Sequence, residues 1–139
     1  MSGEKELCRW RLEQASTCLN SSLKLLELED YASAVSRSYY CIFHCLKSVL
    51  ALDGVDLMKH SAVISYFRRE YVKTGLFDIR FSDILGDAFN LRNASDYTDF
   101  YLVDAEAAAQ QVEDSRYVLA KTKDFLIGRA VLGNGDALL

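Results

Sequence analysis

The sequence contains no proline and only seven glycines among its 139 residues. Proline breaks helices and glycine weakens them, so a chain with so few of either can sustain long helices. The sequence also lacks an apolar run of about 18 residues, which a membrane-spanning helix requires. Its first residues show no apolar signal-peptide core. We therefore expect a soluble, cytoplasmic protein that has no membrane association.

An excess of basic residues is also absent. The formal net charge is −4 and the isoelectric point is near 5.1, which counts against a protein that coats nucleic acid through a basic surface. Half of the residues are apolar and 12% are aromatic, so disorder is excluded as well. A chain of this length forms one domain with a real core. We expect a single helical domain over residues 1–127 and a weakly ordered tail over 128–139.

The four cysteines form no C-x-x-C pair. Cys41 and Cys45 are one helical turn apart with His44 between them, but structural zinc sites usually need four ligands at recognisable spacings. No pair of acidic residues has metal-ligand spacing either. We expect no metal, no cofactor and small buried thiols in a reducing compartment.

The segment 31–52 is predicted to be the central helix. Starting just before this segment, apolar residues recur in steps of three and four, which keeps one helix face against a partner; they are Leu28, Ala32, Val35, Tyr39, Ile42, Leu46 and Val49. On the opposite side, Arg37 and His44 share one azimuth, about two turns apart. Because further apolar residues widen the stripe, the helix is apolar around most of its circumference. This surplus predicts a homodimer.

The other helices follow from the same spacing and from their end signals. We expect helices over Glu4–Leu28, Tyr31–Leu52, a short third from a Ser61 cap to Gly75, a fourth capped by Ser82 and running to Ser95, and a last from Asp104 to Gly128. Residues 76–81 and 96–104 are predicted to be loops. The fold class is therefore an all-α bundle.

Basic residues concentrate in one part of this acidic chain. Between Lys59 and Arg80, five cations face only two acids; the cations are Lys59, Arg68, Arg69, Lys73 and Arg80. This patch is either a solvated helix face or a binding surface. Further on, Arg92 follows a row of apolar residues on the fourth predicted helix. Its guanidinium therefore needs either an anionic partner or contact with solvent. An intrahelical pair with Asp96 is one way to satisfy Arg92.

Four strings together resemble the small single-domain prokaryotic branch of the HEPN family: YASAVSRSYYCIFHCLKSVL, KHSAVISYFRREYVKTG, LRNASDY and DAEAAAQQVEDSRYVLAKTKDFL. The resemblance spans about Leu19 to Leu126. It implies an antiparallel bundle of four long helices plus a short fifth helix, usually dimerised around a central groove. Many HEPN proteins are metal-independent RNases of toxin, CRISPR or defence systems, with an arginine, four to six residues and a histidine as their signature. In such a site arginine would stabilise phosphate charge, and histidine would transfer a proton.

The signature is degraded in this chain. Arg92 and the polar Asn93 match its start, but Tyr97 stands where histidine is expected. A free tyrosine has a pKa near 10, which makes it a poor general base at neutral pH. Arg37 and His44 satisfy the spacing, yet they lie in the central helix, where a chance match is the simpler explanation.

Three functions follow from the resemblance. The first is a HEPN-type module that binds a nucleotide or RNA, paired with a minimal nucleotidyltransferase in a toxin-antitoxin-like or defence system. The alternative is an active, metal-independent endoribonuclease that uses Arg92 with Tyr97, His44 or His60. A purely structural helical dimer is the third, so the sequence leaves open whether the chain is an enzyme.

The predicted binding site lies where Arg92 approaches Lys59 and His60, with Tyr97 and Tyr101 alongside. Arg37 is also assigned to the binding site, and the sequence leaves open whether Arg37 and His44 lie near Arg92. Arginine offers a planar fork to phosphate, and aromatic rings offer stacking faces for bases. Acidic side chains oppose a phosphate in this region, namely Asp96, Asp99 and Asp104. We therefore expect weak, salt-sensitive binding.

Overall fold

The structure is a computed structural model that describes residues 2–129. Its elements are α1 (Ser2–Glu27), α2 (Tyr31–Leu52), α3 (His60–Phe67), the π-helical turn η1 (Arg68–Val72), α4 (Ile79–Tyr97) and α5 (Ala105–Gly128). No strand occurs within this described range. The predicted all-α class, with four long helices and one short helix, is confirmed.

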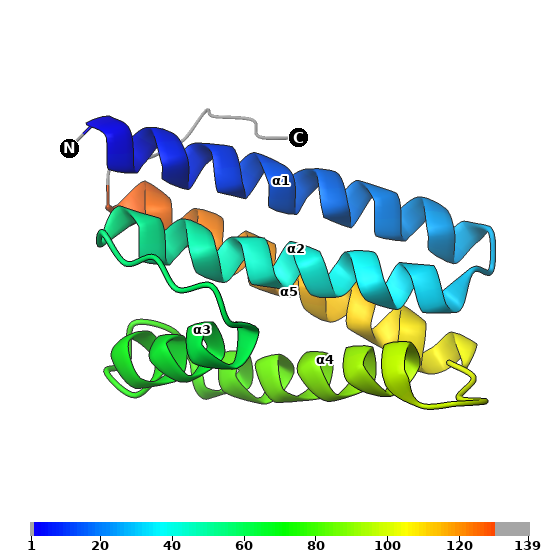
Figure 1. Cartoon of the computed structure of the whole chain (residues 1–139). Helices are drawn as coiled ribbons and strands as arrows, with labels where there is room; N and C mark the ends of the chain where they lie inside the picture. Colours follow the sequence, from blue (N-terminus) through cyan, green and yellow to red (C-terminus); the bar gives the residue numbers. More distant parts are fainter. Residues whose placement is uncertain (1, 130–139) are drawn as a thin grey trace.

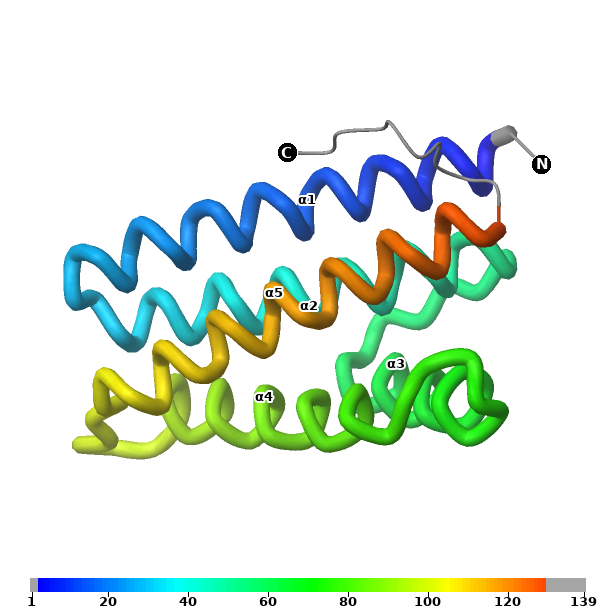
Figure 2. Tube along the Cα trace, turned by 180° about the vertical axis from the view of Figure 1, so that it is seen from behind, coloured from blue at the N-terminus to red at the C-terminus, as the bar shows by residue number. Residues whose placement is uncertain are grey.

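The long helices form a bundle in which successive members run in opposite directions (Figure 1). Helices α1 and α2 make a hairpin along one side, whereas α3 and α4 lie on the other side of α2. Seen from behind, α5 crosses α2 between α1 and α4 (Figure 2). Within the described range no helix is long and apolar enough to cross a membrane.

Helix α2 occupies the centre of this bundle. Its start and end match the prediction, because the Asp30 carboxylate accepts from the amide of Ser33 and Gly54 follows the helix with a φ of +73°. Other helices of the same chain cover α2 on several sides, so its apolar circumference is accounted for without a second chain. Ser48 of α2 is buried, and its hydroxyl donates to the carbonyl of Cys45.

Helix α5 also follows its predicted pattern. The Asp104 carboxylate caps it by accepting from the amide of Ala107 at 2.7 Å. Its inward row is buried from Ala108 to Leu126. One buried polar side chain, Gln111, ties α5 to α2 by donating to the carbonyl of Val35 and the hydroxyl of Ser38.

Two predicted helix starts are wrong. Helix α3 begins at His60 with Lys59 at the N-cap, and Ser61 makes no cap. Helix α4 begins at Ile79, four residues before the predicted start, because the carboxylate of Asp78 rather than the hydroxyl of Ser82 caps it. The expected loop over 76–81 is therefore partly helical.

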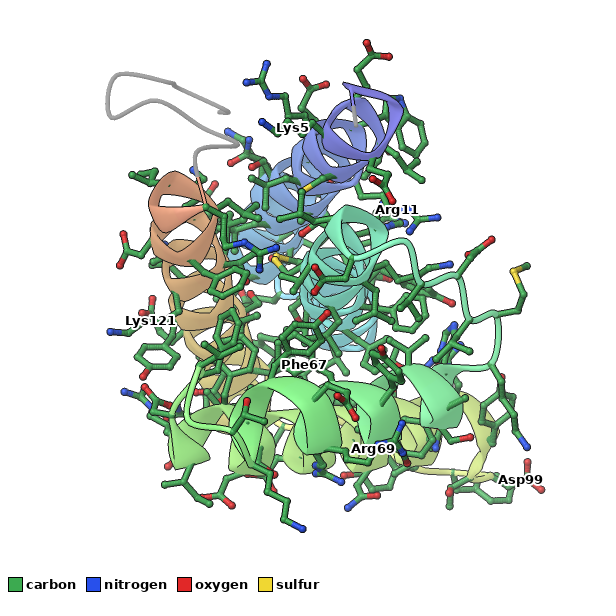
Figure 3. All side chains as sticks on the ribbon, turned by 90° about the vertical axis from the view of Figure 1, so that its left-hand side faces the viewer. Lys5, Arg11, Phe67, Arg69, Asp99 and Lys121 are labelled. Atoms are coloured by element: carbon green, nitrogen blue, oxygen red, sulfur yellow. The ribbon has the colours of Figure 1, made fainter. Side chains whose placement is uncertain are left out.

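Burial of aromatic rings explains the early start of α4. Phe81, in the first turn, packs against Phe67 and Phe77 with ring centroids 5.4 and 4.7 Å apart. Phe67 points into the interior, whereas Arg69 lies on the outside (Figure 3). The hydroxyl of Tyr117 on α5 donates to Asp78 and holds this cap in place.

The end of α4 also differs from the prediction. Asp96 and Tyr97 belong to the helix, not to the loop expected over 96–104. An ion pair between Arg92 and Asp96 spans this last turn. The predicted tail over 128–139 lies almost wholly outside the described residues, so the predicted domain boundary at residue 127 stays a prediction.

Candidate functional site

A polar and aromatic cluster lies where α2, α3 and α4 meet. We call it the Arg92 cluster, and its members are Tyr39 and Tyr40 of α2, His60 of α3, and Arg92, Asp96 and Tyr97 of α4. The members come from three helices, so tertiary packing rather than a local motif assembles the cluster.

Arg92 is at its centre, with a side chain that is only 13% exposed. Its Nη2 donates to the hydroxyl of Tyr40 at 3.2 Å. Its Nε is buried 2.9 Å from Oδ2 of Asp96, an ion pair that lacks the alignment of a hydrogen bond. The predicted pairing of Arg92 with Asp96 is thus present.

Three tyrosine rings surround the Arg92 guanidinium. Its Cζ lies 5.2 Å from the ring centroid of Tyr39, 5.6 Å from that of Tyr40 and 5.7 Å from that of Tyr97. At such distances the ring quadrupoles attract a cation. Tyr97 is 73% exposed, so it borders the solvent side of the cluster, whereas Tyr39 and Tyr40 form its inner wall.

His60 joins the cluster through a hydrogen bond. Its Nδ1 lies 3.0 Å from the hydroxyl oxygen of Tyr39, and the centroid of its ring lies 4.0 Å from that of the Phe43 ring. Burial, and then the positive charges of Arg92 and Lys47, lower the pKa of His60. Burial raises the pKa of Tyr39 to about 12. Near neutral pH, His60 is therefore a neutral imidazole beside a protonated phenol.

His44 adjoins the cluster along α2. Its ring lies 6.4 Å from that of Tyr40, the phenol that accepts from Arg92. Burial comes first among the causes that lower the pKa of His44, followed by the charge of Arg37. Arg37 itself points toward α1, where its Nη2 lies 3.2 Å from Sγ of Cys18. The Arg37 and His44 ridge thus meets the Arg92 cluster through Tyr40.

Two predicted site residues lie apart from the Arg92 cluster. Lys59 is exposed at the N-cap of α3. Tyr101 is in the segment after α4 and 41% exposed. Within the described range, neither side chain has a hydrogen bond, ion pair or ring contact with a cluster member. The structure therefore brings together Arg92, His60 and Tyr97, places His44 next to them, and leaves Lys59, Tyr101 and Arg37 at the periphery.

The sequence did not identify Tyr39 and Tyr40 as members of the site. Tyr39 was assigned to the apolar stripe, and it is indeed 2% exposed, but its hydroxyl holds His60. Tyr40 precedes His44 by one helical turn, a spacing at which side chains meet on a helix surface. That spacing could have pointed to Tyr40. The hydrogen bond between Tyr39 of α2 and His60 of α3 joins residues far apart in the chain, so the sequence near either residue gives no sign of it.

This arrangement suits an anion more than a metal. Within residues 2–129, no three histidine, cysteine, aspartate or glutamate side chains come together as a set of metal ligands. Arg92 supplies a guanidinium fork whose neighbouring rings hold it in place. A phosphate could compete with Asp96 for this cation, and His60 lies close enough to the same cation for its pKa to be affected.

Comparison with known proteins agrees with the fold. A sequence model of the HEPN domain matches residues 8–125. A protein of Methanocaldococcus jannaschii named "Putative toxin MJ0142" is 33% identical over 126 residues, which cover 90% of this chain and 86% of the relative. A UPF0332 protein of Thermotoga maritima is 36% identical over 68% of this chain and 70% of its own length.

Proposed function

Because the chain belongs to the HEPN family, we propose that it is a toxin-like HEPN protein whose Arg92 cluster binds the phosphodiester backbone of RNA. The observation that carries this proposal is the position of Arg92, a largely buried cation held between Tyr40 and Asp96 and flanked by three aromatic rings. Arginine forks match phosphate oxygens, and exposed rings such as that of Tyr97 offer faces to bases.

The proposal includes a weak, salt-dependent affinity. The chain is acidic overall, and Asp96 already neutralises part of the Arg92 charge. Binding that depends on phosphate contacts weakens as salt rises, because counterions then compete for the same charges. The test is a titration of a fluorescent single-stranded RNA at low salt into wild type, Arg92→Gln and Arg116→Gln. Arg116 is an exposed cation on α5 and serves as the matched control.

We expect Arg92→Gln to weaken RNA binding at least tenfold and Arg116→Gln to leave it nearly unchanged. Equal binding by all three proteins would show that Arg92 only stabilises the end of α4. The absence of binding at any salt concentration would favour the purely structural dimer.

A minimal nucleotidyltransferase is the partner that we propose, on the basis of the HEPN resemblance. Its test is co-expression with a neighbouring nucleotidyltransferase reading frame, followed by co-purification and by cell growth with and without that frame. Independent purification and unchanged growth would count against the pairing.

The pairing of His60 with Tyr39 favours a second candidate, a metal-independent endoribonuclease. His60 is neutral near pH 7, and in the tautomer whose Nδ1–H donates to Tyr39 its Nε2 is a free base. Such a base could accept the proton of a ribose 2′-hydroxyl while Arg92 stabilises the phosphate. RNA cleavage in EDTA that is lost in both Arg92→Gln and His60→Gln would support this reaction, whereas loss in neither variant would exclude it.

A further inference from the structure

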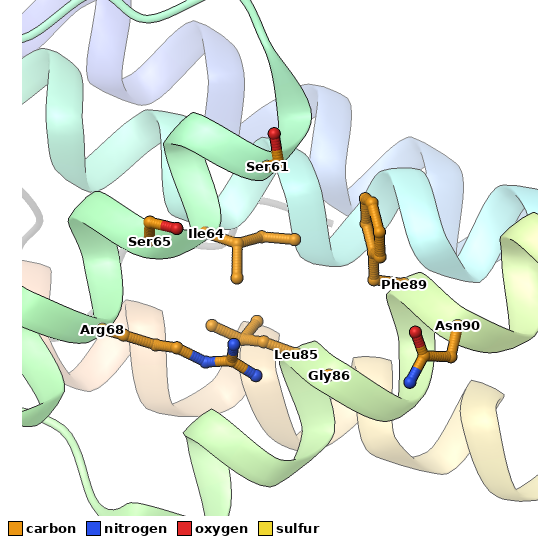
Figure 4. Close-up of a pocket in the computed structure, with 8 residues that line it drawn as sticks. All are labelled: Ser61, Ile64, Ser65, Arg68, Leu85, Gly86, Phe89 and Asn90. Atoms are coloured by element: carbon orange, nitrogen blue, oxygen red, sulfur yellow. The ribbon is translucent and has the colours of Figure 1, made fainter.

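A groove runs between α3 with η1 on one side and α4 on the other. It consists of two hollows, of about 310 and 700 Å³, which share Ser65 and Arg68. Figure 4 shows the smaller hollow, with Arg68 at one end and Phe89 at the other. None of the residues lining the groove belongs to the Arg92 cluster.

Arg68 stands at the junction of the two hollows and is a half-buried cation without a counter-charge. Its Nη2 donates to the carbonyl of Ser82 at 2.9 Å, and its Nε is buried without an acceptor. Among residues 2–129, no carboxylate lies within ion-pair distance of its guanidinium. An unpaired, partly desolvated cation is unfavourable. An anionic ligand in the groove would supply the missing charge.

Local backbone features make room for this arginine. Arg68 begins η1, a π-helical turn, and such turns occur frequently at functional sites. Across the groove, Gly86 exposes bare backbone of α4, and a Cβ there would lie 2.9 Å from Nη2 of Arg68. A larger residue at position 86 would therefore displace the guanidinium from its contact with Ser82.

The two hollows differ in chemistry. Ile64, Leu85 and Phe89 give the smaller one apolar walls, and Asn90 adds an amide at its edge. The larger one is bordered by Arg69 and Lys73, two exposed cations, of which Arg69 pairs with Glu70. The groove thus has an apolar, partly aromatic end and leads past the half-buried Arg68 to further cations. This arrangement suits a ligand with a ring at one end and several negative charges at the other.

We propose that this groove binds a nucleoside di- or triphosphate, either free or as the 5′ end of an RNA. The base would lie against Phe89 in the smaller hollow, with Asn90 available for hydrogen bonds to its edge. The phosphates would cross Arg68 and extend toward Lys73 in the larger hollow. About 310 Å³ is at the lower end of the range for ligand pockets, so the smaller hollow suits one base and ribose. This site is independent of the RNA contact proposed for Arg92.

The experiment is a calorimetric titration of ADP and ATP at low salt into the full chain, with adenosine and inorganic phosphate as partial ligands. We expect ATP to bind more tightly than ADP, and either partial ligand to bind at least tenfold more weakly than ATP. Arg68→Gln should weaken ATP binding at least tenfold, and Lys73→Gln about threefold. Arg116→Gln is the control for net charge, and thermal unfolding followed by circular dichroism verifies that each variant is folded.

The variants separate this proposal from the one for the Arg92 cluster. We expect Arg92→Gln to retain ATP binding and Arg68→Gln to retain the binding of RNA with a 5′-hydroxyl. A triphosphorylated RNA that gains affinity only when Arg68 is present would identify an RNA end as the ligand, and no gain would identify the free nucleotide. ATP binding that survives both Arg68→Gln and Lys73→Gln, or no ATP binding by wild type, would overturn the proposal.

Discussion

Replacing Asp96 by asparagine should make the protein less stable and a better RNA binder. The carboxylate of Asp96 lies 2.9 Å from Nε of Arg92 and is 35% exposed. An ion pair with this much solvent contact contributes about 0.5 to 1 kcal/mol to stability. Asp96→Asn should lower the free energy of unfolding by about that amount, which urea denaturation measures.

The same change removes the negative charge nearest to the proposed phosphate position. At roughly 6 Å and an effective dielectric constant between about 40 and 80, the repulsion between two unit charges is about 1 kcal/mol. Removing it should tighten RNA binding about fivefold at low salt. The gain should shrink near physiological ionic strength, where the screening length is about 8 Å.

Asp99→Asn is the matched control for this prediction. Asp99 carries the same charge three residues further on and is exposed (Figure 3), and within the described range it has no ion pair. Fluorescence anisotropy with one RNA at two salt concentrations compares wild type with both variants. An Asp96→Asn protein that binds RNA no better than Asp99→Asn would refute the proposal that the phosphate lies beside Arg92.

Three further predictions concern the stability of the bundle and its assembly. Gln111→Leu should destabilise the protein by about 1 to 3 kcal/mol in urea unfolding, because Ser38 loses a buried hydrogen bond. The pKa of His60 is lowered in the folded protein, so the unfolded state takes up a proton first as pH falls. The free energy of unfolding should therefore decrease from about pH 7 toward pH 5, and His60→Gln should make this pH dependence weaker. Light scattering at micromolar concentration should return the mass of a homodimer, and a monomer mass would contradict the expected assembly.

The long helices could be predicted from sequence because their signals are local. Asp30 and Asp104 each cap a helix whose inward positions repeat every three or four residues, and the structure contains both caps. The glycine after α2 likewise has the left-handed conformation that ends a helix. Features of this kind depend on a few neighbouring residues, so one sequence is enough to find them.

The starts of α3 and α4 were mispredicted because contacts with other helices decide them. Asp78 and Ser82 are both acceptable caps, and the buried ring of Phe81 together with Tyr117 of α5 selects Asp78. His60 similarly begins α3 while bonded to Tyr39 of α2. The Arg92 cluster depends on the same long-range packing, which is why the sequence suggested Arg92 and His60 but not the tyrosines between them.

The apolar circumference of α2 was the sequence argument for a homodimer, and the structure assigns that surface to packing within one chain. A different surface is available for association. The end of α4 and the segment after it expose Tyr97, Phe100 and Leu102, with exposed fractions from 73% to 101%. Apolar side chains that gather on a surface favour contact with another protein.

The position of this surface connects assembly to the proposed function. Tyr97 belongs both to it and to the Arg92 cluster. A partner that binds at Phe100 and Leu102, whether a second copy or a nucleotidyltransferase, would lie next to Tyr97 on the solvent side of Arg92. Such a partner would exclude water around the Arg92 and Asp96 pair and so strengthen every charge interaction there. RNA affinity at the Arg92 cluster should therefore depend on protein concentration, provided that the association constant lies within the range of the titration.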